Sequence, residues 1–563
     1  MTVYRVITGL LVARTAVHIG TGRVSDTTDA LIRRDGAGQP LIPGTAIAGS
    51  LRALLTRLAP RLGSGVCQAL QGGSASCNCG VCHLFGDINP TDEGEAQASH
   101  LLVFDAPLHS DAPTAIRDGV GVDRATGAAA RAAAAKFDLE ALPAGAAFEL
   151  RMELRGDNEQ DERLLAAALA EWTEGRAWLG GRAARGLGAF DLQDLRCVER
   201  DLDQVDQLVA FLRSDEPWRG AQEVSDWLQT RLEQIEISSA DTPAVARRWI
   251  NAELILQAEG PLLTNDMMAS VISGFDHAPL TATVGDVARP VLPGASLRGV
   301  LRSHAERIAR TLATLNAGDE SEFLLKCPAC DPLVRRSEQE PEPALESCDS
   351  LLKGKVQIGQ ETSADQLCLA CRLFGSTRRG SRLIVEDARF VGDGPVLKML
   401  DFLAIDRFTG GGADGLKFDA LALWKPAFRV RLHLDNPEAW ELGWLALVLR
   451  DLRKGWLNVG YGTAKGFGRV HIADDGWKLQ LGFLGNDGLG LPRTTTSGVY
   501  QVAELNEITK AGWLAQAQEW VKSFNKAVIG TGSVKPRCNE LPISKDTYFG
   551  RPVERLYPKE VNR

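Results

Sequence analysis

The feature that most constrains the fold is that the chain repeats itself. Four short motifs in the first 190 residues recur in the same order between residues 290 and 470. The pairs are PLIPGTAIAGSLR and PVLPGASLRGVLR, CNCGVCHLFG and CLACRLFG, GVDRATG and AIDRFTG, and GGRAARGLGAF and GYGTAKGFGRV. Equivalent residues lie between 250 and 289 positions apart, so the drift is the size of surface loops. We therefore predict a tandem duplication.

At 563 residues the chain is also too long for a single hydrophobic core. We place a first repeated unit at 1–197, a helical linker at 198–248, a second unit at 249–475 and a C-terminal extension at 476–563. Apolar residues at helical spacing predict one helix in the linker and one in the extension. They are Val224, Trp227, Leu228, Leu232 and Ile235, and Trp513, Trp520, Val521 and Phe524.

Each unit has the pattern of a mixed α+β domain. It opens with an alternating strand, YRVITGLLVARTAVHIG or WINAELILQAEGPLLT, and a helix follows the Pro-Gly turn. Later strands such as FELRMELRG and FRVRLHLDN also alternate. This order favours an α+β unit of the ferredoxin-like type in each half.

Charge and hydropathy limit the classes of function. The net charge of −9 argues against indiscriminate coating of nucleic acid, although a local basic groove stays compatible with it. No apolar run reaches the roughly 18 residues of a membrane helix. The apolar stretch 6–13 is followed by Arg14 and His18 rather than by the small residues of a signal-peptide cleavage site. We expect a cytoplasmic protein without membrane association.

Cysteine usage indicates metal. Nine of the eleven cysteines fall within 67–82 and 327–371. Thiols at Cys-x-x-Cys spacing hold one tetrahedral ion, and four thiolates close its coordination sphere, so we expect two structural zinc sites. The predicted ligands are Cys67, Cys77, Cys79 and Cys82, and Cys327, Cys330, Cys368 and Cys371, with His83 and Cys348 as substitutes. The alternative is a set of reduced, buried thiols.

The late glycine-rich motif of each half is a candidate phosphate-binding loop. Glycine lets backbone amides approach a phosphate closely, and the interspersed cations supply positive charge. These cations are Arg182 and Arg185 in the first half, and Lys465 and Arg469 in the second. Two tight turns are the alternative interpretation. Recurrence at the same place in both halves favours binding.

As an ordered set, these motifs resemble the RAMP superfamily, and more narrowly the backbone subunits of type III CRISPR effector complexes. The fusion of two units is similar to the double-backbone subunit of type III-D variant systems. The resemblance implies two ferredoxin-like (RRM-like) units, each with a zinc-binding insertion and a thumb hairpin that begins at GVDRATG or AIDRFTG. It also implies an antiviral ribonucleoprotein complex that contains guide RNA, target RNA and other effector subunits.

The resemblance further implies an endoribonuclease whose aspartate lies between the first strand and the Pro-Gly turn. Asp29 and Asp276 best match that position, with Asp26 and Asp266 as weaker candidates, and Mg²⁺ or another divalent ion is the expected cofactor of cleavage. The residues expected to bind RNA are His18, Arg52, Arg124, Arg182, Arg185, Gly186, Gly188, Arg298, Arg302, Arg407, Lys465, Gly466 and Gly468.

Two other functions fit the same motifs. One is a scaffold that binds guide RNA without cutting, in which one or both acid sites are inert. The other is a guide-processing endonuclease of the same superfamily, in which His18 acts as the base. For the hairpins, the alternative is a surface turn in which Asp123 pairs with Arg124, and Asp406 with Arg407.

Overall fold

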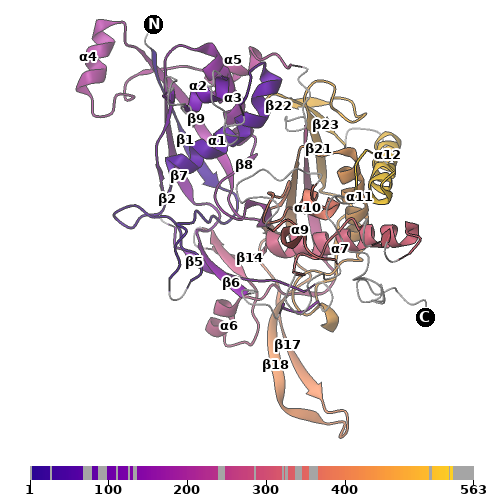
Figure 1. The fold of residues 1–563 in the computed structure, drawn as a ribbon. Helices are drawn as coiled ribbons and strands as arrows, with labels where there is room; N and C mark the ends of the chain where they lie inside the picture. The colour runs from indigo at the N-terminus through magenta and orange to yellow at the C-terminus, as the bar shows by residue number, and fades with distance from the viewer. Residues whose placement is uncertain are drawn as a thin grey trace.

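The computed structural model describes most of the chain. The residues described are 3–25, 28–67, 79–86, 98–109, 112–123, 127–130, 136–238, 248–284, 287–319, 322–323, 327–335, 345–353, 366–505, 510–531 and 533–536. Two antiparallel sheets with helices packed on them form the body, and one long hairpin projects from it (Figure 1). This arrangement confirms the mixed α+β prediction.

The first repeat is a four-stranded antiparallel arrangement in the order β9-β1-β7-β3, with β10 added beside β9. Its elements are β1 (Val3–Ala13), β2 (Leu41–Ile42), α1 (Gly44–Leu58), α2 (Gly80–Phe85), β3 (Leu101–Val103), β4 (Ala106–Pro107), β5 (Ala115–Val120), β6 (Lys136–Ala141), β7 (Ala147–Arg155), α3 (Glu159–Thr173), β8 (Ala177–Trp178) and β9 (Ala189–Asp201). Helix α1 buries Ile47, Leu51, Leu55 and Leu58, which recur every three to four residues and so form one face.

The second repeat has the same plan around β11. Its elements are β11 (Arg248–Ala258), β12 (Pro261–Leu262), α6 (Met267–Ser273), β13 (Thr281–Val284), β14 (Val287–Leu292), α7 (Gly294–Asn316), α9 (Cys348–Leu351), α10 (Leu369–Phe374), β15 (Leu383–Val385), β16 (Ala388–Val391), β17 (Leu397–Ile405), β18 (Gly412–Trp424), β19 (Ala427–Asp435), α11 (Ala439–Arg453) and β20 (Val470–Ile472). Strand β11 pairs with β19 on one side and with β20 on the other, as β1 pairs with β7 and β9.

The linker contains α4 (Val205–Arg213), β10 (Gln222–Glu223) and α5 (Trp227–Glu233). The predicted linker helix is therefore shorter than expected, because residues 222–223 pair with β9 as a strand and the helix begins only at Trp227. The indole of Trp227 is buried and donates to Glu162 Oε2 at 3.2 Å, which anchors α5 on α3.

The C-terminal extension is built into the second repeat. Strands β21 (Lys478–Phe483), β23 (Tyr500–Glu504) and β22 (Thr495–Ser497) continue its sheet from β11 outward. Helix α12 (Lys510–Ile529) buries Trp520 and Phe524, in agreement with the predicted apolar stripe; the side chain of Trp513 lies outside the described residues. Gly443 of α11 permits this packing, because a Cβ there would lie 2.1 Å from Trp520 O.

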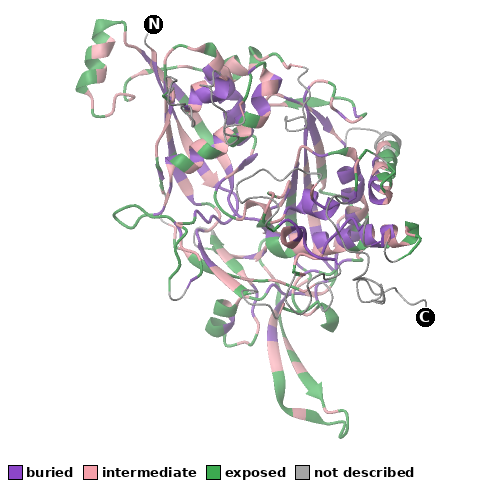
Figure 2. Cartoon of the chain, viewed as in Figure 1, coloured by how far each residue is buried: buried purple, intermediate pink, exposed green. Residues whose placement is uncertain are grey.

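The two repeats meet in a junction with its own small core. Leu58 and Ala167 of the first repeat pack with Trp249, Leu484 and Tyr500. The buried Arg14 guanidinium also crosses the junction and donates to both carboxylate oxygens of Glu386, at 2.9 and 2.6 Å. Buried residues are concentrated in the two sheets and their helices, whereas the β17–β18 hairpin is mostly exposed (Figure 2).

Candidate functional site

Two aspartates form a reciprocal pair at the acid loop of the first repeat. The backbone N–H of Asp29 donates to Asp138 Oδ1 at 2.8 Å, and the N–H of Asp138 donates to Asp29 Oδ2 at 2.9 Å. Asp138 follows Phe137 in strand β6, so the pair links the loop that carries Asp29 to the β5–β6 hairpin. Each carboxylate keeps a second oxygen that these two bonds do not use.

The second repeat contains the same pair. Asp276 N–H donates to Asp419 Oδ1 at 2.9 Å, and Asp419 N–H donates to Asp276 Oδ2 at 3.0 Å. Asp276 is thus the structural counterpart of Asp29. Sequence reasoning missed the partners Asp138 and Asp419, although both follow a Lys-Phe dipeptide that recurs in the two halves.

The weaker acid candidates lie elsewhere. Asp266 is the N-cap of α6, where its carboxylate accepts from the N–H groups of Met268 and Ala269 at 2.8 and 3.1 Å. This turn-capping role is typical of aspartate and occupies one carboxylate oxygen. Asp26 lies outside the described residues.

Each glycine-rich loop folds back on the start of its repeat: Gly188 N–H donates to Ala16 O and Gly468 N–H donates to Pro261 O, both at 2.8 Å. Gly188 and Gly468 adopt φ of 72° and 74°, and a Cβ at either would lie 2.0 Å from a backbone carbonyl oxygen, that of Leu179 or Val459. The motif therefore needs glycine for close backbone packing at these two positions. A short 3-10 turn in each loop carries Arg185 or Lys465 on the surface.

A cation of each loop stands over the phenylalanine beside the paired acid. The Arg182 guanidinium carbon is 4.1 Å from the Phe137 ring centroid, and Lys465 Nζ is 4.2 Å from that of Phe418. Burial and the neighbouring Arg185 hold the pKa of Arg182 below its usual value, an effect that Asp29 opposes. Cations and carboxylates thus share one site in each repeat.

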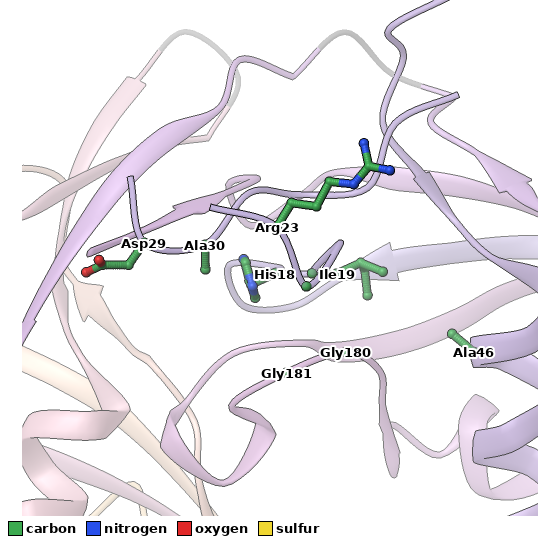
Figure 3. A pocket seen from close by; sticks show the side chains of 10 residues that line it. His18, Ile19, Arg23, Asp29, Ala30, Ala46, Gly180 and Gly181 are labelled. Atoms are coloured by element: carbon green, nitrogen blue, oxygen red, sulfur yellow. The ribbon is translucent and has the colours of Figure 1, made fainter. Parts of the chain in front are cut away.

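An open pocket of about 500 Å³ lies beside Asp29. Figure 3 shows that His18, Asp29 and Ala30 line it from one side and Gly180 and Gly181 from the other. His18 is buried, and its Nδ1 lies 2.7 Å from Glu140 O, which fixes the ring in the wall of the pocket.

The helix arginines contact the cysteine motifs of their own repeats. Arg52 donates to Gly86 O at 3.1 Å and to Cys82 Sγ at 3.2 Å, and Arg302 donates to Gly375 O at 3.2 Å. Arg302 is buried, and Arg298 donates to Phe374 O. These arginines donate to carbonyls and sulfurs at the cysteine motifs, and their binding of RNA stays a prediction.

The Pro-Gly helix starts are also occupied. Gly44 N–H donates to Asp105 Oδ1 at 2.7 Å, and Gly294 N–H donates to Asp387 Oδ1 at 2.9 Å. These carboxylates take the place that an RNA phosphate would need at the helix N-terminus. Gly186, for which RNA contact stays a prediction, packs on Gly294 at the junction.

The cysteines of the second repeat converge on one point. The Sγ atoms of Cys330, Cys348, Cys368 and Cys371 lie within 4.8 Å of one another, and all four residues are buried. Cys348 therefore replaces Cys327 in the predicted set; Cys327 Sγ donates to Ala329 O at 3.2 Å instead. Four thiolates at this spacing can hold a tetrahedral metal ion.

Three cysteines of the first repeat form a similar group, Cys67, Cys79 and Cys82. The predicted fourth ligand, Cys77, lies outside the described residues. His83, the predicted substitute, lies outside this group: its Nδ1 lies 2.8 Å from Asp161 Oδ2, as the Nδ1 of His100 does at 3.0 Å. The nine cysteines described are all free of disulfides.

The hairpin tips have the same turn in both repeats. Asp123 and Asp406 each accept at their carbonyl from a glycine four residues on, Gly127 or Gly410. The Asp406 carboxylate accepts from the N–H groups of Thr409 and Phe408, which lower the pKa of Asp406, so the alternative Asp406–Arg407 pair is not what organises this turn. Arg407 is exposed beside it, and Arg124 lies outside the described residues.

Fold and site together define a duplicated α+β protein with a paired-acid loop, a cation-bearing glycine loop and a cysteine cluster in each half. The sequence profile of the RAMP superfamily matches residues 10–191 and 280–471, which is more than half of the chain. The chain therefore belongs to the RAMP superfamily, and the match to both halves confirms the predicted duplication.

Two curated relatives are both named CRISPR system Cms endoribonuclease Csm3. The one from Methanocaldococcus jannaschii is 24% identical over 209 residues, which are 34% of this chain and 80% of the relative. The one from Methanothermobacter thermautotrophicus is 24% identical over 225 residues, which are 35% of this chain and 87% of the relative. Within the part of the chain that the structure describes, no helix has the length and apolarity needed to cross a bilayer.

Proposed function

We propose that this chain is a double backbone subunit of a type III CRISPR effector complex, which holds guide RNA and cuts the paired target RNA at two sites. The observation that carries the proposal is the reciprocal pair Asp29–Asp138, repeated as Asp276–Asp419. We assign a ferredoxin-like core to each repeat, centred on β1 in the first and on β11 in the second, and this core would present the pair beside the glycine loop. The names of the relatives support the same class of activity.

The chemistry assigned to each site is transfer of a phosphate from the 5′-oxygen of one nucleotide to the 2′-hydroxyl of its neighbour. Such in-line attack depends on alignment and on stabilisation of charge. Arg182 and Lys465 stand next to the acid pairs and would bind the phosphate. A divalent cation such as Mg²⁺ fits the oxygen donors, would be held by the two carboxylates of each pair, and would stabilise charge on the phosphate.

The cysteine clusters complete the proposal as structural zinc sites. Closed sets of four thiolates leave no coordination position for a substrate, so a catalytic role is disfavoured. The buried cluster Cys330, Cys348, Cys368 and Cys371 joins α9, α10 and the loop of Cys330 into one unit. We infer that the first cluster is completed by Cys77.

The test is a cleavage ladder on end-labelled target RNA with the guide-loaded protein. Asp29→Asn should abolish one cut and leave the other, and Asp276→Asn should do the converse. Asparagine keeps a carbonyl oxygen that can accept from Asp138 or Asp419 N–H, so the fold should be retained while the charge is lost.

The matched control is Asp266→Asn, since asparagine is an equally good N-cap for α6 and both cuts should persist. Both cuts should stop with a chelator of divalent ions. If the wild-type protein binds guide RNA with full affinity but makes no cut, the scaffold function replaces this proposal. Cleavage of the guide precursor that depends on His18 would instead support the processing endonuclease.

A further inference from the structure

The two paired-acid sites differ at positions that correspond through the backbone. Gly181 N–H donates to His18 O at 3.0 Å, and Tyr461 N–H donates to Leu263 O at 2.7 Å. Leu263 therefore stands where the first repeat has His18, and Tyr461 stands where it has Gly181. At this position the second site therefore has a leucine in place of the histidine that lines the first pocket.

A histidine stands instead at another position, next to the acid. Ala30 follows Asp29, and its carbonyl accepts from Glu140 N–H at 2.9 Å; His277 follows Asp276, and its carbonyl accepts from Leu421 N–H at 2.8 Å. His277 thus corresponds to Ala30, which lines the open pocket of the first repeat (Figure 3). Among the described residues named here, each site contains one imidazole, carried by a different segment of the chain: the end of the first strand in the first repeat and the acid loop in the second.

The contacts of His277 orient its ring. The ring is half-buried, 4.5 Å between centroids from Tyr461 and 5.9 Å from Phe418, the residue before Asp419. Its Nδ1 lies 3.3 Å from Asn265 Oδ1. A side-chain carbonyl accepts only, so the neutral ring is assigned the tautomer with the proton on Nδ1 and a lone pair on Nε2.

The two replacements, Asn265 for Gly20 and His277 for Ala30, depend on one another. Asn265 is two residues after Leu263, as Gly20 is two residues after His18, and a Cβ at Gly20 would lie 3.0 Å from His18 Nε2. The first repeat thus needs glycine where the second has the amide that orients His277. An imidazole added only to fill space would not need a hydrogen-bonding partner to appear at the same time.

We propose that His277 is a catalytic residue of the second site and accepts the proton of the attacking 2′-hydroxyl. The inference rests on the proposed function. In the step, the bond from the 2′-oxygen to phosphorus forms and the bond from phosphorus to the 5′-oxygen breaks. The proton passes to His277 Nε2, and the 5′-oxygen takes a proton from water, so the products are a 2′,3′-cyclic phosphate and a 5′-hydroxyl. Asp276 and Lys465 flank the same phosphate.

The experiment measures the rate of each cut separately in the full-length, guide-loaded protein. His277→Ala should slow the Asp276-dependent cut by about 100-fold or more, the usual contribution of a positioned general base, and leave the Asp29-dependent cut unchanged. Added imidazole should restore much of the lost rate in His277→Ala. His277→Phe keeps an aromatic ring against Tyr461 and Phe418 but should be as slow, and imidazole should not restore it.

The matched control is His109→Ala, because His109 is exposed and pairs only with Glu149 among the contacts described; both cuts should stay at the wild-type rate. Target affinity and melting temperature should be unchanged in His277→Phe.

A His277→Ala protein that makes the second cut at the wild-type rate, while Asp276→Asn makes none, overturns this inference and leaves the proposed function intact. Loss of the cut without rescue by imidazole assigns His277 a structural role and also overturns it. A wild-type protein that makes only the Asp29-dependent cut overturns the second site and this inference together.

Discussion

The two glycine-rich loops have the same backbone and opposite surroundings. At Gly186 a Cβ would lie 2.5 Å from Asp387 Oδ1 and 2.9 Å from Gly294 Cα, whereas at Gly466 it would meet no described atom within 4 Å. The first loop docks on the start of α7, and Asp387 N–H donates to Gly186 O at 3.2 Å. Duplication has therefore given equivalent loops different tasks, one in the junction and one on the open surface.

The largest difference between the repeats is expected at the cysteine clusters. Cys371→Ser should lower the free energy of unfolding by about 5 kcal/mol, part of the roughly 10–16 kcal/mol that a structural zinc contributes. Arg302 is buried beside this cluster. Burial lowers the pKa of its guanidinium, but Glu306 and the sulfur of Cys371 raise that pKa above its usual value. Without the ion the sulfurs would take up protons, and Arg302 would lose their negative charge and keep its pairing with Glu306 at 2.7 Å.

The comparison for this prediction is Cys82→Ser in the first repeat, where Cys67 and Cys79 are half-exposed. We expect about half the loss of stability there, because water can solvate the remaining thiols. Elemental analysis should give about two zinc ions per wild-type chain and about one in each variant. Equal destabilisation by the two substitutions would show that burial of the cluster does not set its contribution.

The next effect tests the junction itself. Gly186→Leu should cost about 2–5 kcal/mol, because a positive φ costs roughly 1–2 kcal/mol for a residue with a Cβ and overpacking adds about 1–3 kcal/mol. Gly466→Leu, at a φ of 87°, should cost only the backbone part, about 1–2 kcal/mol. Unfolding in denaturant measures both, and similar losses for the two variants would mean that the loops are equally open.

The sequence predicted what depends on local pattern. The duplication, the α+β class and the stripe that includes Trp520 and Phe524 follow from motif order and from periodicity, because apolar spacing determines which face of an element is buried. The equivalence of Asp29 and Asp276 was likewise readable from their place ahead of the Pro-Gly turns. The length of linker helix α5 was overestimated, because residues 222–223 pair with β9, and helical spacing does not reveal such a long-range contact.

Other parts of the site could not be predicted, because they depend on which side chains meet in space. An arginine on an amphipathic helix has the same sequence pattern whether it faces RNA or, as Arg302 does, the sulfurs of a buried cluster. Cys348 lies 18 residues from Cys330 and outside any Cys-x-x-Cys pair, so spacing favoured Cys327. The partners Asp138 and Asp419 are in strands far along the chain from the acids that they contact.

The smallest expected effect concerns RNA affinity, and it distinguishes the loops by charge rather than by packing. Lys465→Ala should weaken guide-RNA binding about fivefold, and the slope of log affinity against log salt should fall by about one, the result of losing one phosphate contact. Arg185→Ala should have a smaller effect, roughly twofold, because Arg182 three residues earlier still supplies charge to that loop. In the second loop the other cation, Arg469, is paired with Glu259 at 3.0 Å and cannot substitute as readily.

Both variants should act equally on guides of unrelated sequence, since phosphates carry no base identity. Fluorescence anisotropy at several salt concentrations gives affinity and slope together. A larger loss in Arg185→Ala than in Lys465→Ala would contradict the division of tasks between the two loops, because the loop at the junction would then be the main contact with RNA.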